Sequence, residues 1–228
     1  IGGACRADVL PNARTMLAWA LEEAGPDGAV LFMPDKHLGR NTGLQLGLGP
    51  DDWHVLRLSG KDGLAESERR PGSAAASRRL LLWPGCCAIH GRLRPESVQA
   101  ARAAHPGCRV LAHPECRPEL IGLCDGSGST SYLIKEAEKA AGEGGTLVIG
   151  TETNLVHRLR DRFAGRCRIE PLAPAICPDM AKVTEENLLA CLQGVTAGTA
   201  PIMTLQDEQL APARASLTRM LQVCAAQR

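Results

Sequence analysis

Short apolar runs alternate along the chain with longer segments in which apolar residues recur every three or four positions. The short runs have the length and composition of strands buried in a parallel sheet. They lie at 29–33, 80–83, 109–112, 146–150 and 168–172. The segments with helical spacing lie at 12–24, 95–104, 129–141, 153–164 and 182–193. This alternation predicts an α/β fold in which helices flank short parallel sheets.

Residues with known preferences for helix ends support several of these boundaries. Pro95 suits the first turn of a helix, and Ser129 suits an N-cap before the run TSYLIKEAEKAA. Gly25 and Gly194 suit helix ends, because glycine adopts the left-handed backbone conformation that ends many helices.

A weak internal repeat appears when the chain is shifted by 117 residues. The shift lays AVLFMPDKHLG (29–39) over TLVIGTETNLV (146–156) and pairs Asp35 with Glu152. Cys87 and Cys177 each follow the next strand of their own half. Chance similarity between two βα segments is an alternative, but the matched cysteines favour a duplication. Residues 43–79, rich in Gly, Ser and Arg, are more typical of a mobile insertion than of a core.

Composition excludes several classes of protein. The 228 residues allow one large or two small domains, at about 100–200 residues each. The formal charge is +1 and aromatic residues make up 3%, so no nucleic-acid partner is expected. No apolar stretch reaches the roughly 18 residues that a membrane span needs, and the start IGGACRADV lacks the features of a secretion signal. We therefore expect a cytoplasmic protein without a membrane partner.

The ten cysteines do not form the pattern of a disulfide-rich secreted domain. No CxxC pair occurs, which counts against zinc ribbons and thioredoxin-type sites. Cys87, in WPGCCAIH (83–90), and Cys177, in CPDM (177–180), each end an apolar run and open a new element. A thiolate near a helix start is a good iron ligand, so both are candidate ligands, and a buried structural Cys86–Cys87 pair is the alternative.

Two further segments carry candidate chemistry. HPEC (113–116) follows a predicted strand and places His113 and Glu115 at its carboxyl end, where open α/β sheets bind ligands. They form a candidate acid/base pair if burial raises the Glu115 pKa, and a helix-capping Glu beside a surface His is the alternative. DGSGSTSY (125–132) presents backbone N–H groups and hydroxyls, including Ser129 and Thr130, to an anion or merely caps a helix.

Taken together, six segments resemble the quinolinate synthase family, the iron–sulfur enzymes of NAD biosynthesis. They are MPDKHLGRNTG (33–43), WPGCCAIH, HPECRPEL (113–120), GSTSYLI (128–134), CPDMAKVTEENLLACL (177–192) and ARASLTRML (213–221). The family folds as three αβα units around a 4Fe-4S cluster, and the chain, which begins with Ile rather than Met, looks like the second and third units without the first. The resemblance implies units at 1–105 (with the 43–79 insertion) and 106–194, followed by a linker and helix at 195–228.

The resemblance also implies roles for individual residues. Cys87 and Cys177 match two cluster cysteines, the third ligand belongs to the missing unit, and neither Cys86 nor Cys116 is expected to be a ligand. The family's His-Pro-Glu motif, which binds substrate, falls on His113, Pro114 and Glu115. The resemblance implies that His113 and Glu115 are catalytic and that Glu115 transfers protons. Ser129 and Thr130 are expected to bind substrate.

One binding position of the family has no clear counterpart. CRADVLPNART (5–15) lacks the family's Ser-rich stretch, and Asn12 or Thr15 is the nearest substitute.

The implied reaction condenses iminoaspartate with dihydroxyacetone phosphate, with release of phosphate and water, using an open iron of the cluster as Lewis acid. A transient contact with the enzyme that supplies iminoaspartate is also expected. Two alternatives are a non-catalytic fragment of the same fold and a zinc-binding α/β protein. The zinc ligands would be Cys87, His90, His113 and Cys116.

Overall fold

The computed structural model describes residues 12–59, 63–69 and 72–226. Residues 1–11, which include Cys5 and the start of the CRADVLPNART stretch, lie outside the described residues. The described chain forms two compact units, one that ends at Ile176 and one that begins at Cys177. Its class is α/β with short parallel sheets, as the sequence predicts. The domain boundaries and the duplication stay predictions.

The first sheet has three parallel strands in the order β1-β3-β2. Its strands are β1 (Val30–Phe32), β2 (Trp53–Val55) and β3 (Leu80–Leu82). Helices α1 (Ala13–Ala24) and α2 (Lys36–Gln45) pack against each other and against this sheet. Leu17 and Leu21 of α1 meet Leu80 and Leu82 of β3, and these four leucines form the local core.

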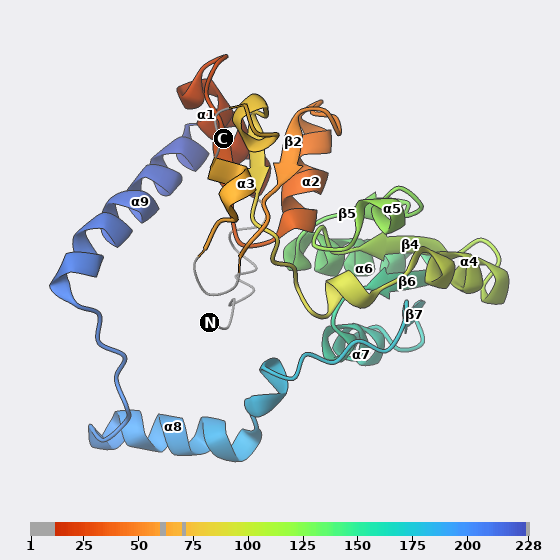
Figure 1. The fold of residues 1–228 in the computed structure, drawn as a ribbon. Helices are drawn as coiled ribbons and strands as arrows, with labels where there is room; N and C mark the ends of the chain where they lie inside the picture. The colour runs from red at the N-terminus through yellow and green to blue at the C-terminus, as the bar shows by residue number, and fades with distance from the viewer. Residues whose placement is uncertain (1–11, 60–62, 70–71, 227–228) are drawn as a thin grey trace. The chain divides into compact units, whose positions relative to one another are not determined.

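The second sheet has four parallel strands in the order β5-β4-β6-β7 (Figure 1). Its strands are β4 (Arg109–Ala112), β5 (Gly126–Ser127), β6 (Thr146–Gly150) and β7 (Arg168–Pro171). Helices α6 (Thr130–Glu143) and α7 (Thr153–Arg162) bury their apolar faces on it. Leu133 of α6, Ile149 of β6, Val156 of α7 and Ile169 of β7 belong to one buried core.

The remaining elements are short helices of the first unit and the helices of the second. In the first unit they are α3 (Glu66–Arg69), α4 (Pro95–Ala104), α5 (Pro118–Ile121) and the 3₁₀ turns η2 (Ala75–Ser77) and η3 (His90–Arg92). In the second they are η4 (Met180–Lys182), α8 (Glu185–Ala197) and α9 (Asp207–Ala225). Neither α8 nor α9 has a buried residue, so these helices supply no core of their own.

All five strands predicted from the apolar runs form, and all five predicted helices are present. The helix predicted at 95–104 has the predicted bounds, and the other four are shifted at one or both ends. Pro95 occupies the first turn of α4, Gly25 ends α1 with a φ of 70°, and the Ser129 hydroxyl accepts the Tyr132 N–H at the start of α6. The helix end predicted at Gly194 is wrong. Helix α8 continues through Gly194 to Ala197, because one glycine in a helix interior lowers its stability by only about 1 kcal/mol relative to alanine. The helix stops where Gly198 takes a left-handed φ of 72°.

The 43–79 segment contributes more to the fold than its composition suggests. Strand β2 lies within it and pairs with β3 along the edge of the first sheet. His54 of this strand is 2.8 Å from the carboxylate of Glu68, which ties the strand to the following helical turn. Whether the segment is an insertion relative to the family stays a prediction.

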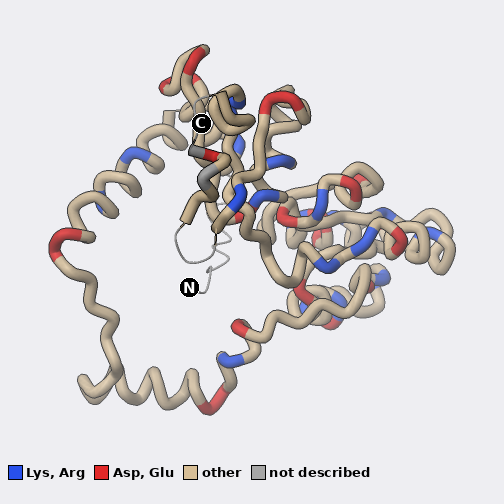
Figure 2. The backbone as a smooth tube through the Cα atoms, in the orientation of Figure 1, with Lys and Arg blue, Asp and Glu red and all other residues tan. Residues whose placement is uncertain are grey.

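Charged residues of both signs are interspersed along the described chain (Figure 2). Among the described helices, none is both long and apolar enough to cross a membrane.

The leucines of the first sheet allow a direct test of where its core lies. Leu82 is completely buried on β3, whereas Leu31 on the neighbouring β1 is 50% exposed. We expect Leu82→Ala to lower the free energy of unfolding by about 2–5 kcal/mol, because it leaves a cavity, and Leu31→Ala to change it by less than about 0.5 kcal/mol. Urea unfolding followed by circular dichroism measures both, and equal losses would contradict this assignment of the core.

Candidate functional site

The candidate site is built from segments that leave the carboxyl ends of three parallel strands. WPGCCAIH follows β3, HPEC follows β4, and Thr151 follows β6. Parallel strands of one sheet end at the same edge, which places HPEC and Thr151 side by side. The segment after β3 brings His90 to this edge from the other sheet, so the site draws on both sheets of the first unit.

His90 is the centre of a buried hydrogen-bonded group. Its Nδ1 is 2.9 Å from Oε2 of Glu115, and its Nε2 is 3.1 Å from the hydroxyl of Thr151. The ring of His113 stacks on the His90 ring, with 4.1 Å between centroids and an angle of 11° between planes. All four residues are buried, so these polar groups have exchanged water for one another.

Burial and these contacts set the charge states of the group. Burial alone disfavours a charged imidazole, but hydrogen bonds to Cys87 and Glu115 outweigh it and raise the pKa of His90 to about 9. Burial raises the pKa of Glu115, yet the hydrogen bond from His90 and the neighbouring imidazoles leave that pKa below its ordinary value. Burial, followed by the charge of His90, lowers the pKa of His113 to about 3.

At neutral pH the group therefore holds a Glu115 carboxylate, a His90 imidazolium and a neutral His113. The predicted acid/base pair depended on a raised Glu115 pKa. Burial acts in that direction, but the charge-assisted hydrogen bond from His90 overcomes it, so the pKa of Glu115 is lowered instead. An ionised Glu115 is ready to accept a proton rather than to donate one. Neutral His113 can donate a hydrogen bond without carrying charge.

The backbone of Cys87 is fixed by the start of α2. Its N–H donates to Oδ2 of Asp35 at 2.6 Å, while Oδ1 of the same carboxylate accepts the N–H groups of His37 and Leu38 and caps the helix. The Cys87 carbonyl accepts the Gly91 N–H at the turn η3. These two hydrogen bonds hold the backbone of Cys87, and its thiol is half-buried.

Glycine is required just before this cysteine. A Cβ atom at Gly85 would collide with the carbonyl oxygen of Pro34. The Gly85 carbonyl in turn accepts the N–H of Lys36, the first residue of α2, at 2.9 Å. The loop that carries Cys87 therefore lies directly against the β1–α2 junction.

Cys87, His90 and Glu115 could hold a metal ion. One ligand atom from each lies within 4.8 Å of the other two. Cys116, which the zinc hypothesis included, is not part of this group. It is fully buried, and its thiol lies 3.7 Å from the Gly150 carbonyl. Burial raises the pKa of the Cys116 thiol above its ordinary value. Cys86 is exposed beside Cys87, so the alternative of a buried Cys86–Cys87 pair is wrong.

Cys177 opens the second unit, so its distance from Cys87 stays a prediction. Its local structure matches that of Cys87. Each cysteine carbonyl accepts the N–H four residues later, a 3₁₀ turn begins three residues after each, and a helix begins eight residues after each.

The segment before Cys177 repeats the backbone hydrogen bond that Lys36 donates to the Gly85 carbonyl. Thr153, the first residue of α7, donates its N–H to the Ala175 carbonyl at 2.9 Å, and its hydroxyl accepts the Ala175 N–H at 2.8 Å. Glu152 caps α7 through the Asn154 and Leu155 N–H groups, as Asp35 caps α2. Gly85 and Ala175 each lie two residues before a candidate cysteine, so the same backbone contact supports both cysteine loops.

Helix α2 also holds HPEC in place. The Asn41 side-chain amide donates to the carbonyl oxygens of Pro114 at 2.7 Å and Cys116 at 2.8 Å. Arg117 follows the motif and donates from Nε to the Gly91 carbonyl at 2.9 Å, which links HPEC to the turn that carries His90. Pro114 thus takes part through its backbone, while His113 and Glu115 supply the polar side chains.

Ser129 and Thr130 stand at the start of α6, beside the strand that leads into HPEC. The Gly128 N–H donates to the carbonyl of Ala112, the residue before His113. The Ser129 hydroxyl caps the helix, as the helix-capping alternative for this segment predicts, and Thr130 is the first helical residue. Of the candidate substitutes for the Ser-rich stretch, Asn12 immediately precedes α1 and Thr15 lies in its first turn.

Three residues of the site were not found from the sequence. Asp35 was noticed for its place in the repeat, and its spacing before the Lys36–Leu38 turn is the signal of an N-cap. Thr151 could have been suspected only from its place after a strand. Asn41 carries no such signal, because its partners lie more than 70 positions away.

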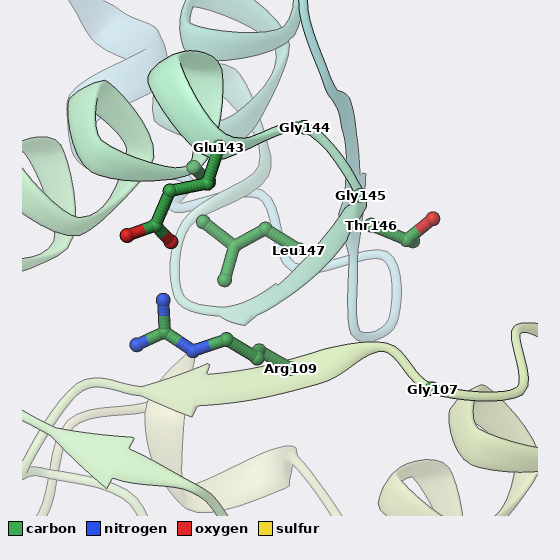
Figure 3. A pocket seen from close by; sticks show the side chains of 8 residues that line it. Gly107, Arg109, Glu143, Gly144, Gly145, Thr146 and Leu147 are labelled. Carbon is green, nitrogen blue, oxygen red and sulfur yellow. The ribbon is translucent and has the colours of Figure 1, made fainter.

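A small hollow lies at the opposite, amino-terminal ends of β4 and β6. It has a volume of about 90 Å³ and is lined mainly by glycines, Arg109 and Glu143 (Figure 3). Arg109 also pairs with Glu136 of α6. This hollow contains none of the predicted site residues.

Comparison with known proteins gives a consistent result. The family model described as quinolinate synthetase A protein matches residues 10–222. A quinolinate synthase of Corynebacterium glutamicum is 37% identical over 218 residues, which cover 93% of this chain and 52% of that protein. Those of Acidobacterium capsulatum and Nocardioides sp. are 36% and 39% identical, over 93% and 82% of this chain and 56% and 48% of their own lengths. The chain thus spans about half the length of the curated relatives it matches.

The buried imidazole of His37 predicts a pH dependence of stability. Burial, with the nearby charges of Lys36 and Arg40, lowers the pKa of His37 to about 4, and its Nδ1 has no hydrogen-bond partner among the described residues. The unfolded chain therefore binds more protons than the folded one between about pH 6.5 and 4, so stability falls as the pH falls through this window.

One such group contributes at most about 1.4 kcal/mol per pH unit. Urea unfolding at several pH values should show a smaller slope for His37→Gln than for the wild type. A slope that His37→Gln leaves unchanged would contradict the buried neutral imidazole.

Proposed function

Because the chain belongs to the quinolinate synthetase A family, we propose that it supplies the proton-transfer group and two cluster cysteines of a quinolinate synthase. The observation that carries this proposal is the convergence of Glu115, His90 and the Cys87 thiol at one buried strand end. An ionised carboxylate there stands beside a cysteine that the resemblance assigns to a cluster. Proton transfer and ligand binding then take place within the same few ångströms.

The proposed reaction condenses iminoaspartate with dihydroxyacetone phosphate and releases phosphate and water to form quinolinate. Glu115 accepts protons, because its carboxylate is ionised at neutral pH and buried away from bulk water. Neutral His113 donates a hydrogen bond that orients a substrate carboxylate. Asn41 donates to the Pro114 carbonyl and so holds the backbone between His113 and Glu115, which fixes where these two side chains lie.

The Ser129–Thr130 turn binds an anionic group of the substrate. The first N–H groups of a helix of 14 residues have no partners within the helix, and they favour negative charge. Because the Ser129 oxygen already accepts the Tyr132 N–H, Thr130 is the better hydroxyl for direct contact with substrate. The enzyme that supplies the unstable iminoaspartate is the expected protein partner.

The two cysteine loops fit the cluster that the family implies. Cys87 presents a half-buried thiol on a loop fixed by Asp35 and η3, and Cys177 lies in a loop with the same local hydrogen bond. Cys87 and Cys177 would hold two irons, and a cysteine outside this chain would hold a third. When bound, the cluster supplies an open Lewis-acidic iron for the dehydration steps.

The cysteine assignment is tested by iron binding. The product of the complete reading frame, purified or reconstituted without oxygen, should hold about four irons, and Cys87→Ala or Cys177→Ala should remove the cluster and its brown colour. Cys86→Ala is the matched control, because this exposed neighbour of Cys87 should keep full iron content. A cluster retained by Cys87→Ala, or lost in Cys86→Ala, would refute the assignment. A folded wild type without iron would refute the proposed function itself.

The role of Glu115 is tested by turnover. Glu115→Gln keeps an oxygen that can accept from His90 but has no carboxylate to take a proton, so kcat should fall by about 10²–10⁴-fold with iron content unchanged. Glu119→Gln, on the exposed side of α5 four residues later, is the control and should leave kcat unchanged. Quinolinate formation from dihydroxyacetone phosphate and freshly generated iminoaspartate measures both. Full activity of Glu115→Gln would exclude it as the proton acceptor.

A further inference from the structure

We propose that His90 is the positioning residue for Glu115: its Nδ1–H donates to one carboxylate oxygen and fixes the orientation in which Glu115 meets substrate. The inference rests on the proposed function, in which Glu115 accepts the proton. His90 belongs to neither the predicted catalytic residues nor the predicted substrate-binding residues. The sequence named it only as a zinc ligand in an alternative hypothesis, and its contact with Glu115 comes from the structure.

The contact between the two side chains is short and protected from water. Nδ1 of His90 and Oε2 of Glu115 are 2.9 Å apart, and the side chains are only 6% and 11% exposed. A hydrogen bond with an ionised partner is about twice as strong as a neutral one, and burial strengthens it further. Since few waters can compete, this bond, together with the contacts to Cys87 and His113, restrains where the Glu115 oxygens point.

His90 is itself held on three sides, so that it can act as a fixed support. Its Nε2 is 3.1 Å from the Thr151 hydroxyl, and its ring stacks on His113. Its backbone lies in η3, where the Gly91 N–H donates to the Cys87 carbonyl. A ring held at its far nitrogen, one face and its backbone cannot turn without breaking several contacts.

The chemistry of the partners fixes which nitrogen of His90 must carry a proton. A carboxylate oxygen accepts hydrogen bonds, and the 2.9 Å contact between Nδ1 and Oε2 requires a hydrogen between them, so Nδ1 is the donor to Glu115. The Thr151 hydroxyl can donate or accept, so it satisfies Nε2 in either protonation state. Every arrangement that satisfies both contacts therefore has a proton on Nδ1.

The alternative arrangement, with a proton on Nε2 alone, would place two acceptors 2.9 Å apart. It would leave the His90–Glu115 contact repulsive in a buried place, where an unpaired polar group costs about 1–3 kcal/mol. A structural role that depended only on the size of the imidazole would not distinguish its two nitrogens. The positioning role does, and this difference can be measured.

The first experiment determines the protonation of His90 in the metal-free chain. The protein is labelled with ¹⁵N-histidine, the ring signals of its six histidines are recorded at neutral pH without oxygen, and His90→Asn identifies the pair that belongs to His90. We expect a protonated Nδ1 whose signal shifts in Glu115→Gln. An unprotonated Nδ1, or a signal indifferent to Glu115→Gln, would overturn the proposal.

The second experiment uses replacements that mimic one nitrogen at a time. The amide nitrogen of Asn lies near the position of Nδ1, whereas that of Gln lies near the position of Nε2. In the cluster-loaded protein, His90→Ala and His90→Gln should lower kcat by about 100-fold with KM unchanged, because a misplaced catalytic group costs about that much. His90→Asn should recover most of the loss.

His105→Asn, at the end of α4, is the matched control and should leave kcat unchanged. Equal losses in His90→Asn and His90→Ala, or a loss confined to KM, would overturn the proposal. A wild type that makes no quinolinate would refute the proposed function instead, and the nitrogen measurement would still decide whether His90 donates to Glu115.

Discussion

The site depends first on one buried carboxylate, that of Asp35. It accepts three backbone N–H groups, two from the start of α2 and one from Cys87. It therefore joins the segment after β1 to the segment after β3, whose strands lie next to each other in the sheet. Burial raises the pKa of Asp35, and the three donors act against that rise. This single group connects the Cys87 loop to the start of α2, and the contact between Lys36 and Gly85 reinforces the connection.

From this anchor the other parts of the site are connected in sequence. Helix α2 carries Asn41, whose amide holds the backbone on both sides of Glu115. The Cys87 loop leads within three residues to His90, which reaches Glu115 from the other direction. The Glu115 carboxylate is thus supported by α2 through its backbone and by the Cys87 loop through its side chain. A disturbance at Asp35 would reach Glu115 by both routes.

The two cysteine loops show how one solution can serve twice in a chain. In each, the first N–H of a helix donates to the carbonyl two residues before the cysteine, and an acidic residue caps that helix. These contacts need only a parallel pair of strands, a capping carboxylate and a short loop, so they survive low sequence identity. Cys87 and Cys177 are therefore held by loops with the same local backbone contacts.

The sequence predicted the parts of this structure that depend on local patterns. Apolar runs located all five of the strands it assigned, and Ser129 and Pro95 marked helix starts, because capping is decided within a few residues. Helix α2 was missed because the polar, glycine-containing segment KHLGRNTGLQ has no clear apolar face and is held by its cap and by packing. Strand β5, with two residues, is too short for any pattern.

The site was predictable as motifs but not as geometry. His113 and Glu115 were identified from their place after a strand, yet the partner that sets the Glu115 charge lies 25 positions away and comes from another sheet. The sequence suggested that burial would raise the Glu115 pKa, because burial is a local expectation. The lowered pKa follows from a tertiary contact with His90, which no local pattern encodes.

The central claim is that Cys87 binds iron at the place where Glu115 and His90 converge. Anomalous X-ray diffraction at the iron absorption edge, on crystals of the complete protein loaded without oxygen, tests it most directly. The account predicts an iron signal bonded to the Cys87 thiol and adjacent to the Glu115 carboxylate. Iron bound elsewhere, with the Cys87 thiol unligated, would contradict it.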